Sequence, residues 1–215
     1  MLTSCISMSI KKGSLGDLSA IILCSGISKR FGSNKLIADL HGKPVLWYVI
    51  SHVQKSGIND VYLVTNPEIL SELEAYFPNE NYIINKNYNY GMSSSVVSAV
   101  KKLRYDFSRI LIINGDQPFF NATLIKALIS TQDSHPENIV SASYMGSPRN
   151  PAVFPHEFYG ELLLLRGDTG AKSLIHDNTT KVSLVEVGDE TYLFDIDTRY
   201  DYEKAKTIPL SYLDS

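Results

Sequence analysis

The sequence predicts an α/β protein with a Rossmann-like, doubly wound and mostly parallel sheet. Short apolar runs of strand length alternate with segments of helical periodicity, which is the pattern of a parallel sheet covered by helices. The first run, LSAIILC at 18–24, is almost continuously apolar, as expected of a strand buried on both faces. A length of 215 residues with 44% hydrophobic content suits one domain with a single sizeable core.

Strands and helices follow one another through the first two thirds of the chain. Pro44 and Gly57 bracket the first helix in the order that helix ends favour. The helix that begins at Met92 is predicted despite its serines, because Val96 and Leu103 share an apolar helical face. Strands are expected at 18–24, 60–65, 81–85 and 109–114, and helices at 44–57, 67–77, 92–103 and 121–132.

Beyond residue 135 the predicted elements are shorter. A Gly- and Pro-rich link separates two strands, and Thr198 and Asp201 predict a capping box at the start of the last helix. We expect 1–17 to be a poorly ordered N-terminal extension and 18–207 to be the single domain, since no composition shift marks a linker. Extended segments are expected at 138–144, 151–155, 181–187 and 192–197, and helices at 158–166, 171–177 and 198–206.

The charge and cysteine content argue against several classes of function. The net charge of −3 provides no overall attraction for nucleic acid or an anionic membrane. No apolar run reaches the length that a bilayer span needs. Cys5 and Cys24 are too few for a thiolate metal site or a disulfide framework, and they indicate a reducing compartment. We therefore expect a cytoplasmic protein that binds neither nucleic acid nor membrane.

The first strand runs into the loop LCSGISKRFGSNKL at 23–36, which has the composition of a polyphosphate-binding loop. Its spacing matches neither the P-loop nor the G-x-G-x-x-G dinucleotide motif. Its glycines would allow close backbone approach, and Lys29, Arg30 and Lys35 would supply positive charge. Open α/β sheets bind ligands at this position. A solvated basic loop is the alternative, and this segment alone is compatible with both.

Acidic residues lie where two further segments end. Asp116 follows the strand 109–114 in the turn Gly-Asp-Gln-Pro. It either shapes that turn or holds Mg²⁺, which binds a few carboxylates together with substrate phosphates. In the segment 192–197, Asp195 and Asp197 share one face of the chain. A solvent-facing strand end would tolerate these like charges, and a bound metal would explain them.

A further polar stretch begins the helix at 92–103. Gly91 precedes this helix, and Ser93, Ser94 and Ser95 occupy its first turn. A helix N-terminus with several hydroxyls suits the binding of an anion or a base. Plain N-capping is the alternative, although one serine would suffice for it.

Six stretches occur in order between residue 18 and about residue 206: LCSGISKRFGSNK, NYNYGMSSSV, GDQP, GSPRNPAVF, GDTGAKSLI and DIDTRYDY. Together they resemble the nucleotidyltransferase family that includes the molybdenum-cofactor enzymes MobA and MocA, and the C-terminal stretches resemble its MocA-type cytidylyltransferase branch. The resemblance implies the fold of nucleotide-diphospho-sugar transferases. It also implies a reaction in which a substrate phosphate attacks the α-phosphorus of a nucleoside triphosphate, with Mg²⁺ as cofactor and pyrophosphate as the leaving group.

The resemblance also implies the residues of the site. Arg30 and Lys35 would neutralise the α- and β-phosphates, while Asp116 and Asp197 would hold Mg²⁺, with Asp195 as a further or alternative ligand. The implied catalytic residues are Arg30, Lys35, Asp116 and Asp197. The implied nucleotide-binding residues are Leu23, Cys24, Ser25, Gly26, Lys35, Asn85, Ser94 and Gly115. The implied acceptor-binding residues are Asn150, Asp168 and Gly170.

The chain departs from the family pattern at several positions. Cys24-Ser25 stands where the cytidylyl-transferring branch has Ala-Ala and the guanylyl-transferring branch has Gly-Gly. The absence of the second glycine and the MocA-like C-terminal stretches favour CTP. Phe31 replaces Met, and Lys172 and Arg199 replace Arg and Pro, which are local changes within the motifs.

The implied acceptor is molybdopterin or the molybdenum cofactor, and a molybdoenzyme or its chaperone would receive the product. Transfer onto a sugar- or alditol-phosphate is an alternative, because enzymes of that kind share the first loop and the aspartate pair. A nucleotide-binding regulator without turnover is an alternative of another class. Retention of the basic loop residues and the aspartates argues against the regulator.

Overall fold

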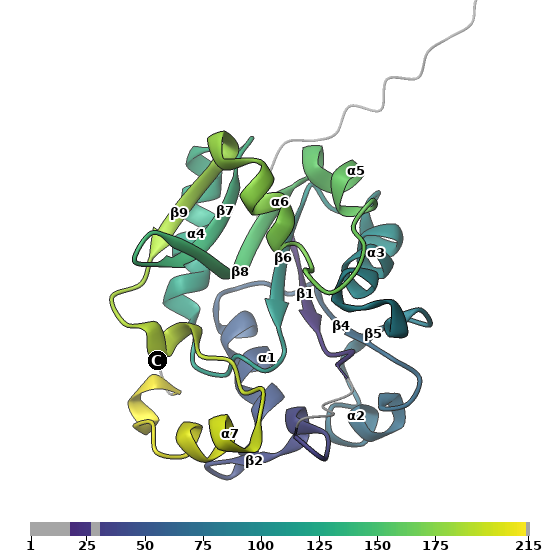
Figure 1. The fold of residues 1–215 in the computed structure, drawn as a ribbon, viewed down its shortest axis with the longest axis vertical. Helices are drawn as coiled ribbons and strands as arrows, with labels where there is room; N and C mark the ends of the chain where they lie inside the picture. Colours follow the sequence, from purple (N-terminus) through teal and green to yellow (C-terminus); the bar gives the residue numbers. More distant parts are fainter. Residues whose placement is uncertain (1–17, 27–30, 214–215) are drawn as a thin grey trace, which may run out of the picture.

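A seven-stranded sheet forms the centre of the computed structural model, which describes residues 18–26 and 31–213. The expected extension at 1–17 lies outside the described residues. The strand order is β5-β4-β1-β6-β8-β7-β9 (Figure 1), and β8 runs antiparallel to both of its neighbours while the other pairs are parallel. The predicted α/β class with a mostly parallel sheet is confirmed. The strands are β1 (Leu18–Leu23), β4 (Val61–Thr65), β5 (Asn81–Ile84), β6 (Arg109–Asn114), β7 (Ile139–Tyr144), β8 (Ser147–Pro155) and β9 (Val182–Glu186).

Helices cover both faces of this sheet (Figure 1). Alternate residues of β1 point to opposite faces, so Ala20 and Ile22 pack on the side of α1, α2 and α4, and Ile21 packs on the side of α3, α5 and α6. Burying one isoleucine side chain in this way stabilises the fold by roughly 1.5–3 kcal/mol. Within the described ranges, no helix has the length and hydropathy of a membrane span. The helices are α1 (Val45–Lys55), α2 (Leu70–Tyr76), α3 (Met92–Leu103), α4 (Ala122–Ser134), α5 (Tyr159–Leu162), α6 (Lys172–Asp177) and α7 (Arg199–Ala205).

The winding of the sheet changes direction between β1 and β6. From β1 the chain passes through α1 to β4, whereas β6 follows α3 and pairs with the opposite edge of β1. The two helices lie on opposite faces of the sheet. Leu23 and Asn114, the last residues of the two strands, are register partners. Such a switch point leaves a crevice at the carboxyl ends of the strands, where α/β proteins bind ligands.

The strand β8 is longer than the sequence predicts, because it begins at Ser147 and not at residue 151. Met145 and Gly146 form the turn from β7, with φ angles of 50° and 72°. The prolines of this stretch suggested a link between strands. Before Ala152, however, β8 pairs with β7 and has no register partner in β6. A segment with one neighbouring strand tolerates proline as a sheet edge does.

The segment 192–197 is only in part the extended element that the sequence predicts. Its first residues belong to a 3-10 helix, η6 (Glu190–Leu193), in which Asp189 accepts a hydrogen bond from the Thr191 N–H at 2.8 Å. The residues that follow pair with no strand of the described sheet. The alternation of apolar and acidic residues is therefore not a sign of a strand here. It reflects two environments on either side of a single extended chain.

A third apolar cluster attaches the C-terminal helix α7 to the rest of the molecule. The predicted capping box is confirmed, since Thr198 and Asp201 each accept a hydrogen bond from the other's backbone. The cluster includes Leu40 from a hairpin of β2 (Asp39–Leu40) and β3 (Lys43–Pro44), which the sequence did not predict. Its buried members are Phe31, Leu40, Val45, Tyr48, Phe119, Ile196, Tyr202, Ala205 and Leu213.

Candidate functional site

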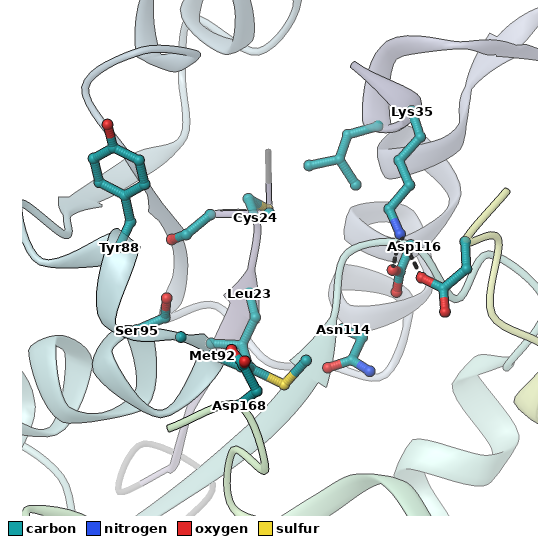
Figure 2. Close-up of a pocket in the computed structure, with 14 residues that line it drawn as sticks. Leu23, Cys24, Lys35, Tyr88, Met92, Ser95, Asn114, Asp116 and Asp168 are labelled. Carbon is teal, nitrogen blue, oxygen red and sulfur yellow. Dashed lines mark hydrogen bonds and ion pairs between the residues drawn. The ribbon is translucent and has the colours of Figure 1, made fainter. Parts of the chain in front are cut away.

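A cavity of about 420 Å³ opens at the switch point between β1 and β6 (Figure 2). Its walls come from the end of β1, the short helix η2 (Lys35–Ile37), the turn after β6, the start of α3 and the segment before α7. The residues that line it are Leu23, Cys24, Ser25, Gly26, Lys35, Leu36, Tyr88, Gly91, Met92, Ser95, Asn114, Asp116, Asp168 and Asp197.

Lys35 lies between two carboxylates on one side of the cavity. Asn34 caps η2 by accepting a hydrogen bond from the Leu36 N–H at 3.1 Å, which fixes where Lys35 leaves the backbone. The Lys35 ammonium donates to Asp116 Oδ2 at 2.6 Å and to Asp197 Oδ1 at 2.9 Å. Burial lowers the pKa of Lys35, but the charges and hydrogen bonds of the two carboxylates outweigh burial and raise it overall. The ammonium therefore stays charged.

Asp116 is positioned by a turn that needs glycine before it. The Gly115 N–H donates to Leu23 O at 3.0 Å, and a Cβ on Gly115 would lie 3.0 Å from that oxygen and 3.1 Å from Cys24 Sγ. A side chain there would push the turn away from β1. Asp116 Oδ1 is buried and has no hydrogen-bond partner within the described part of the chain. Such an oxygen carries a desolvation cost that a contacting cation would offset.

The C-terminal segment brings Asp197 to Asp116. The Ile196 N–H donates to Asp116 O at 3.0 Å, and the Ile196 side chain is buried in the third cluster. Phe194 packs against the same cluster, whereas Asp197 contacts Lys35 on the cavity side. The two faces predicted for this segment are therefore present, although the segment is not a strand.

Asp195 lies beside the same group of charges. Asn114 donates to Asp195 Oδ1 at 3.5 Å and accepts a hydrogen bond from Asn150 Nδ2 at 2.9 Å. Burial, followed by the negative charge of Asp116, raises the pKa of Asp195 to about 7. The described part of the site thus holds more acidic groups than Lys35 alone neutralises.

The aspartates Asp116 and Asp197 fit a divalent cation. Mg²⁺ usually takes one or two carboxylates together with substrate phosphates and water, and does not need a cage made only of protein. Among the described residues no three or more His, Cys, Asp and Glu side chains form such a cage. Asp116 offers its buried, unpartnered Oδ1, and the side chain of Asp197 is 46% exposed toward the opening. A cation could bind both if the Lys35 ammonium moved away.

The opposite side of the cavity is backbone held at the ends of β1 and β4. Ser25 Oγ donates to Val64 O at 2.9 Å, and Ser25 O accepts a hydrogen bond from Asn66 Nδ2 at 2.9 Å. Cys24 is buried, and burial together with the charge of Asp116 raises the pKa of its thiol. A protonated buried thiol is not a nucleophile. The residues after β1 therefore offer shape and backbone groups, not reactivity.

The start of α3 is ordered by Asn85, which follows β5. Asn85 Nδ2 donates to Ser94 Oγ at 2.8 Å and to Ser95 Oγ at 3.1 Å. Ser95 lines the cavity, whereas Ser94 donates to Gly91 O at 2.7 Å and lines a second cavity. The N-cap position itself is Gly91, so the serines do not act as the cap. The structure thus places Ser95 at the main cavity and not Ser94, which the sequence analysis had assigned.

Gly91 lets the loop before α6 approach the start of α3. Its φ is 90°, and a Cβ there would lie 2.4 Å from Asp168 Oδ1 and 2.6 Å from the backbone of Gly167. The Ser93 N–H donates to Gly167 O at 3.0 Å. The contact fixes Asp168 at the rim of the cavity.

The remaining predicted residues lie around this cavity with one exception. Arg30 lies outside the described residues. Asn150 does not line the cavity but contacts Asn114, and a Cβ on Gly170 would lie 2.9 Å from Met92 Sδ. The predicted residues that line the cavity are Leu23, Cys24, Ser25, Gly26, Lys35, Asp116, Asp168 and Asp197. Those behind its wall are Asn85, Gly115, Asn150 and Gly170.

Several lining residues were not found from the sequence. Asn114 had a signal, because a polar residue that ends a buried strand before Gly-Asp-Gln-Pro faces the same edge as Asp116. Ser95 belongs to the serine-rich first turn of α3 that the sequence indicates as a binding element, whereas Tyr88 and Met92 had no signal. Their directions depend on the 3-10 helix η3 (Tyr88–Tyr90) and on the positive φ of Gly91, which periodicity does not reveal.

Known proteins resemble this chain in sequence. A family model described as MobA-like NTP transferase domain matches residues 20–182. The bifunctional protein GlmU of Aquifex aeolicus (strain VF5) is 35% identical over 111 residues, which are 50% of this chain and 24% of that protein. The chain spans about a quarter of the length of the GlmU relatives that it matches. The purine catabolism protein PucB of Bacillus subtilis (strain 168) is 26% identical over 199 residues, 88% of this chain and 96% of that protein.

Solved structures share the fold. Rv0371c from Mycobacterium tuberculosis H37Rv superposes with a TM-score of 0.79 at 21% identity, over 90% of this chain and 98% of that one. The molybdopterin-guanine dinucleotide biosynthesis protein A of Archaeoglobus fulgidus superposes with a TM-score of 0.67 at 17% identity, over 88% and 97% of the two chains. At these identities the likeness shows the fold alone.

Proposed function

Because the chain belongs to the MobA-like NTP transferase domain family, we propose that it transfers a cytidylyl group from CTP onto the phosphate of a molybdopterin-type acceptor. The observation that carries the proposal is the Lys35 ammonium held between Asp116 and Asp197 at the sheet's switch point. A triphosphate needs positive charge for its oxygens, and its metal ion needs carboxylates. Both are present on one side of a cavity whose other side is backbone from the end of β1.

In the proposed reaction an oxygen of the acceptor phosphate attacks the α-phosphorus of CTP. A bond forms between that oxygen and the α-phosphorus. The bond from the α-phosphorus to the oxygen that bridges it to the β-phosphate breaks, and pyrophosphate leaves with that electron pair. Both reactants are anions, and charge builds up on the leaving group. The protein must therefore supply orientation and positive charge, and needs no covalent nucleophile.

The cavity residues divide this work. Lys35 would leave the carboxylates and bind the triphosphate oxygens, where it neutralises the charge of the leaving group. Asp116 and Asp197 would hold Mg²⁺, which when bound polarises the α-phosphate. Arg30, outside the described residues, is expected to add a second positive charge. Asp195, whose raised pKa leaves it only partly charged near neutral pH, would ionise fully beside a bound cation and then help to hold it.

The choice of CTP and of the acceptor rests on sequence features. Cys24-Ser25 lacks the second glycine of the guanylyl-transferring branch, and the C-terminal stretches resemble the cytidylyl-transferring one. Among the proposed acceptor residues, Asp168 lines the cavity directly. Asn150 would act through Asn114, with which it shares a hydrogen bond of 2.9 Å.

The test is pyrophosphate release from CTP or GTP with Mg²⁺, in the presence and absence of molybdopterin. We expect release with CTP that depends on molybdopterin and is slower with GTP. Release with a panel of sugar- or alditol-phosphates, and none with molybdopterin, would replace the acceptor class. Tight CTP binding without release in the presence of any acceptor would support the regulator instead.

A further inference from the structure

We propose that Tyr88 is the stacking platform for the nucleobase of the bound triphosphate, and that Glu68 holds its ring in place. The inference rests on the proposed function, because it needs a nucleotide in the cavity. It adds a residue that neither the family resemblance nor the comparisons assign. It also predicts what the ring contributes, which is affinity for any base and no choice among bases.

Tyr88 lies on the side of the cavity away from the phosphate-binding charges. Figure 2 shows Tyr88 and Ser95 on one side of Leu23 and Cys24, and Lys35 with Asp116 on the other. A triphosphate bound by Lys35 and Asp116 would therefore place its base toward Tyr88. Tyr88 lines the cavity, and Figure 2 shows its hydroxyl pointing away from Leu23.

A chain of hydrogen bonds runs from the end of β1 to the Tyr88 ring. Asn66, which is fully buried after β4, donates to Ser25 O at 2.9 Å and accepts from the backbone N–H groups of Glu68 and Ile69 at 2.8 and 3.2 Å. The Glu68 carboxylate in turn accepts a hydrogen bond from the Tyr88 hydroxyl. The turn 66–69 thus fixes the ring relative to the backbone at Ser25.

The same turn explains a difference from the sequence prediction. A helix was expected from residue 67, but α2 begins at Leu70. The Asn66 side chain takes up the N–H groups of the intervening residues in a local turn, which competes with helix formation. Glu68, which accepts the hydrogen bond from Tyr88, therefore lies in this turn and not in the helix.

The hydrogen bond with Glu68 suits a structural support. It raises the pKa of Tyr88, so the phenol keeps its proton and continues to donate. Glu68 and Tyr88 lie on different loops, after β4 and after β5. The ring is therefore attached to one loop by its backbone and to the other by its hydroxyl, which restricts its motion before a nucleotide binds. Binding of the base then costs less conformational entropy of the Tyr88 side chain.

An aromatic face binds every base, because each base has a π-face and stacking reads no hydrogen-bond pattern. Tyr88→Ala should therefore weaken CTP and GTP by similar factors, on the order of tenfold or more. Inorganic tripolyphosphate has no base, so its affinity should not change. The stacking contact between the ring and the base is the same in the ground state and the transition state. Its loss should therefore raise KM for CTP while kcat stays near the wild-type value.

The experiment measures dissociation constants of CTP, GTP and inorganic tripolyphosphate by calorimetry with Mg²⁺, for the wild type, Tyr88→Ala, Tyr88→Phe and Glu68→Ala. The proposal predicts that Tyr88→Ala loses about tenfold for both nucleotides and nothing for tripolyphosphate. Tyr88→Phe keeps the stacking face and should stay within a few-fold of the wild type, and Glu68→Ala should lie between.

Two results would overturn the platform while leaving the proposed function intact. One is Tyr88→Ala with unchanged CTP affinity. The other is a loss that is equal for CTP and tripolyphosphate, since a misfolded cavity would weaken both. Failure of the wild type to bind either ligand would instead remove the proposed function and this role together.

Discussion

Lys35 is the residue on which the charge balance of the site depends. Its ammonium contacts Asp116 and Asp197 at 2.6 and 2.9 Å, and its side chain is 11% exposed. In that position it stabilises two neighbouring carboxylates that would otherwise repel. It also lies where a cation shared by the two aspartates would bind. Lys35 therefore neutralises the two aspartates and also occupies the place of a cation that they would bind. Substitutions at Lys35, Asp116 and Asp197 should separate these two roles.

Asp116→Ala is expected to abolish turnover and leave the fold intact. The residue lies in the turn after β6 and lines the cavity, so its removal creates no core void. Pyrophosphate release should fall by about 100-fold or more, the scale seen when a preorganised electrostatic group is lost. The thermal midpoint should stay near the wild-type value. Asp177→Asn, an exposed change at the end of α6, is the control. A normal rate in Asp116→Ala would contradict the metal-ligand role.

Lys35→Met is expected to change metal and nucleotide affinity in opposite directions. Removing the ammonium leaves Asp116 and Asp197 without their shared partner, so free Mn²⁺ should bind more tightly in the absence of nucleotide, by about tenfold or more. CTP should bind more weakly, because a phosphate-binding charge is lost. Electron paramagnetic resonance of Mn²⁺ measures the first effect, with Lys126→Met on the exposed face of α4 as the control. Unchanged Mn²⁺ affinity would mean that Lys35 and the cation do not compete.

At the scale of an element, α7 positions the second aspartate from its N-terminus. The Asp201 carboxylate accepts hydrogen bonds from the Thr198 N–H at 2.8 Å and the Asp197 N–H at 3.3 Å. Arg199 Nε donates to Phe31 O at 3.1 Å, and its guanidinium lies 4.5 Å from the Phe31 ring centroid. Arg199 was a minor departure from the family pattern, yet it ties this helix start to the loop after β1. The hydrogen bonds that cap α7 therefore also hold the backbone of Asp197 at the site.

Thr198→Ala is expected to lower both stability and activity. Loss of the cap should reduce the free energy of unfolding by about 1 kcal/mol. It should also reduce turnover, because Asp197 precedes the cap and shares the Asp201 carboxylate with it. Urea unfolding and pyrophosphate release measure the two effects. Thr180→Ala, on the exposed 3-10 helix η5 (Thr179–Lys181), is the control. A stability loss without any change in turnover would show that the cap does not position Asp197.

The sequence predicts elements well where the pattern and the packing agree. The helix at 92–103 and the strand at 109–114 have the predicted bounds, because each has one apolar pattern and one core to bury it. The segment 192–197 shows the limit. Its alternation correctly separates Ile196 from Asp197, but alternation does not reveal whether a partner strand lies alongside. Tyr88 was missed because its place depends on contacts with Glu68, a residue twenty positions away.

At the scale of the whole molecule, the site lies where segments from both ends of the described chain meet. The third apolar cluster joins Phe31, after β1, to Ile196 and to Tyr202 of α7. Lys35 and Asp197 are 162 residues apart in sequence and in contact in space. A ligand that bridges Lys35, the aspartates and the end of β1 therefore links the two ends of the domain. Binding should stabilise the fold as a whole.

Thermal unfolding should show this coupling and its dependence on a divalent cation. With CTP and Mg²⁺ at 100 times the dissociation constant, the stabilisation is about 2.7 kcal/mol, which raises the midpoint by roughly 5–10 °C for a chain of this size. With CTP and EDTA the shift should nearly vanish, because the triphosphate then faces the acidic pair without a cation between them. Asp116→Asn should show the small shift under both conditions. An equal shift with Mg²⁺ and with EDTA would mean that the aspartates bind no metal with the nucleotide, and that Lys35 alone holds the phosphates.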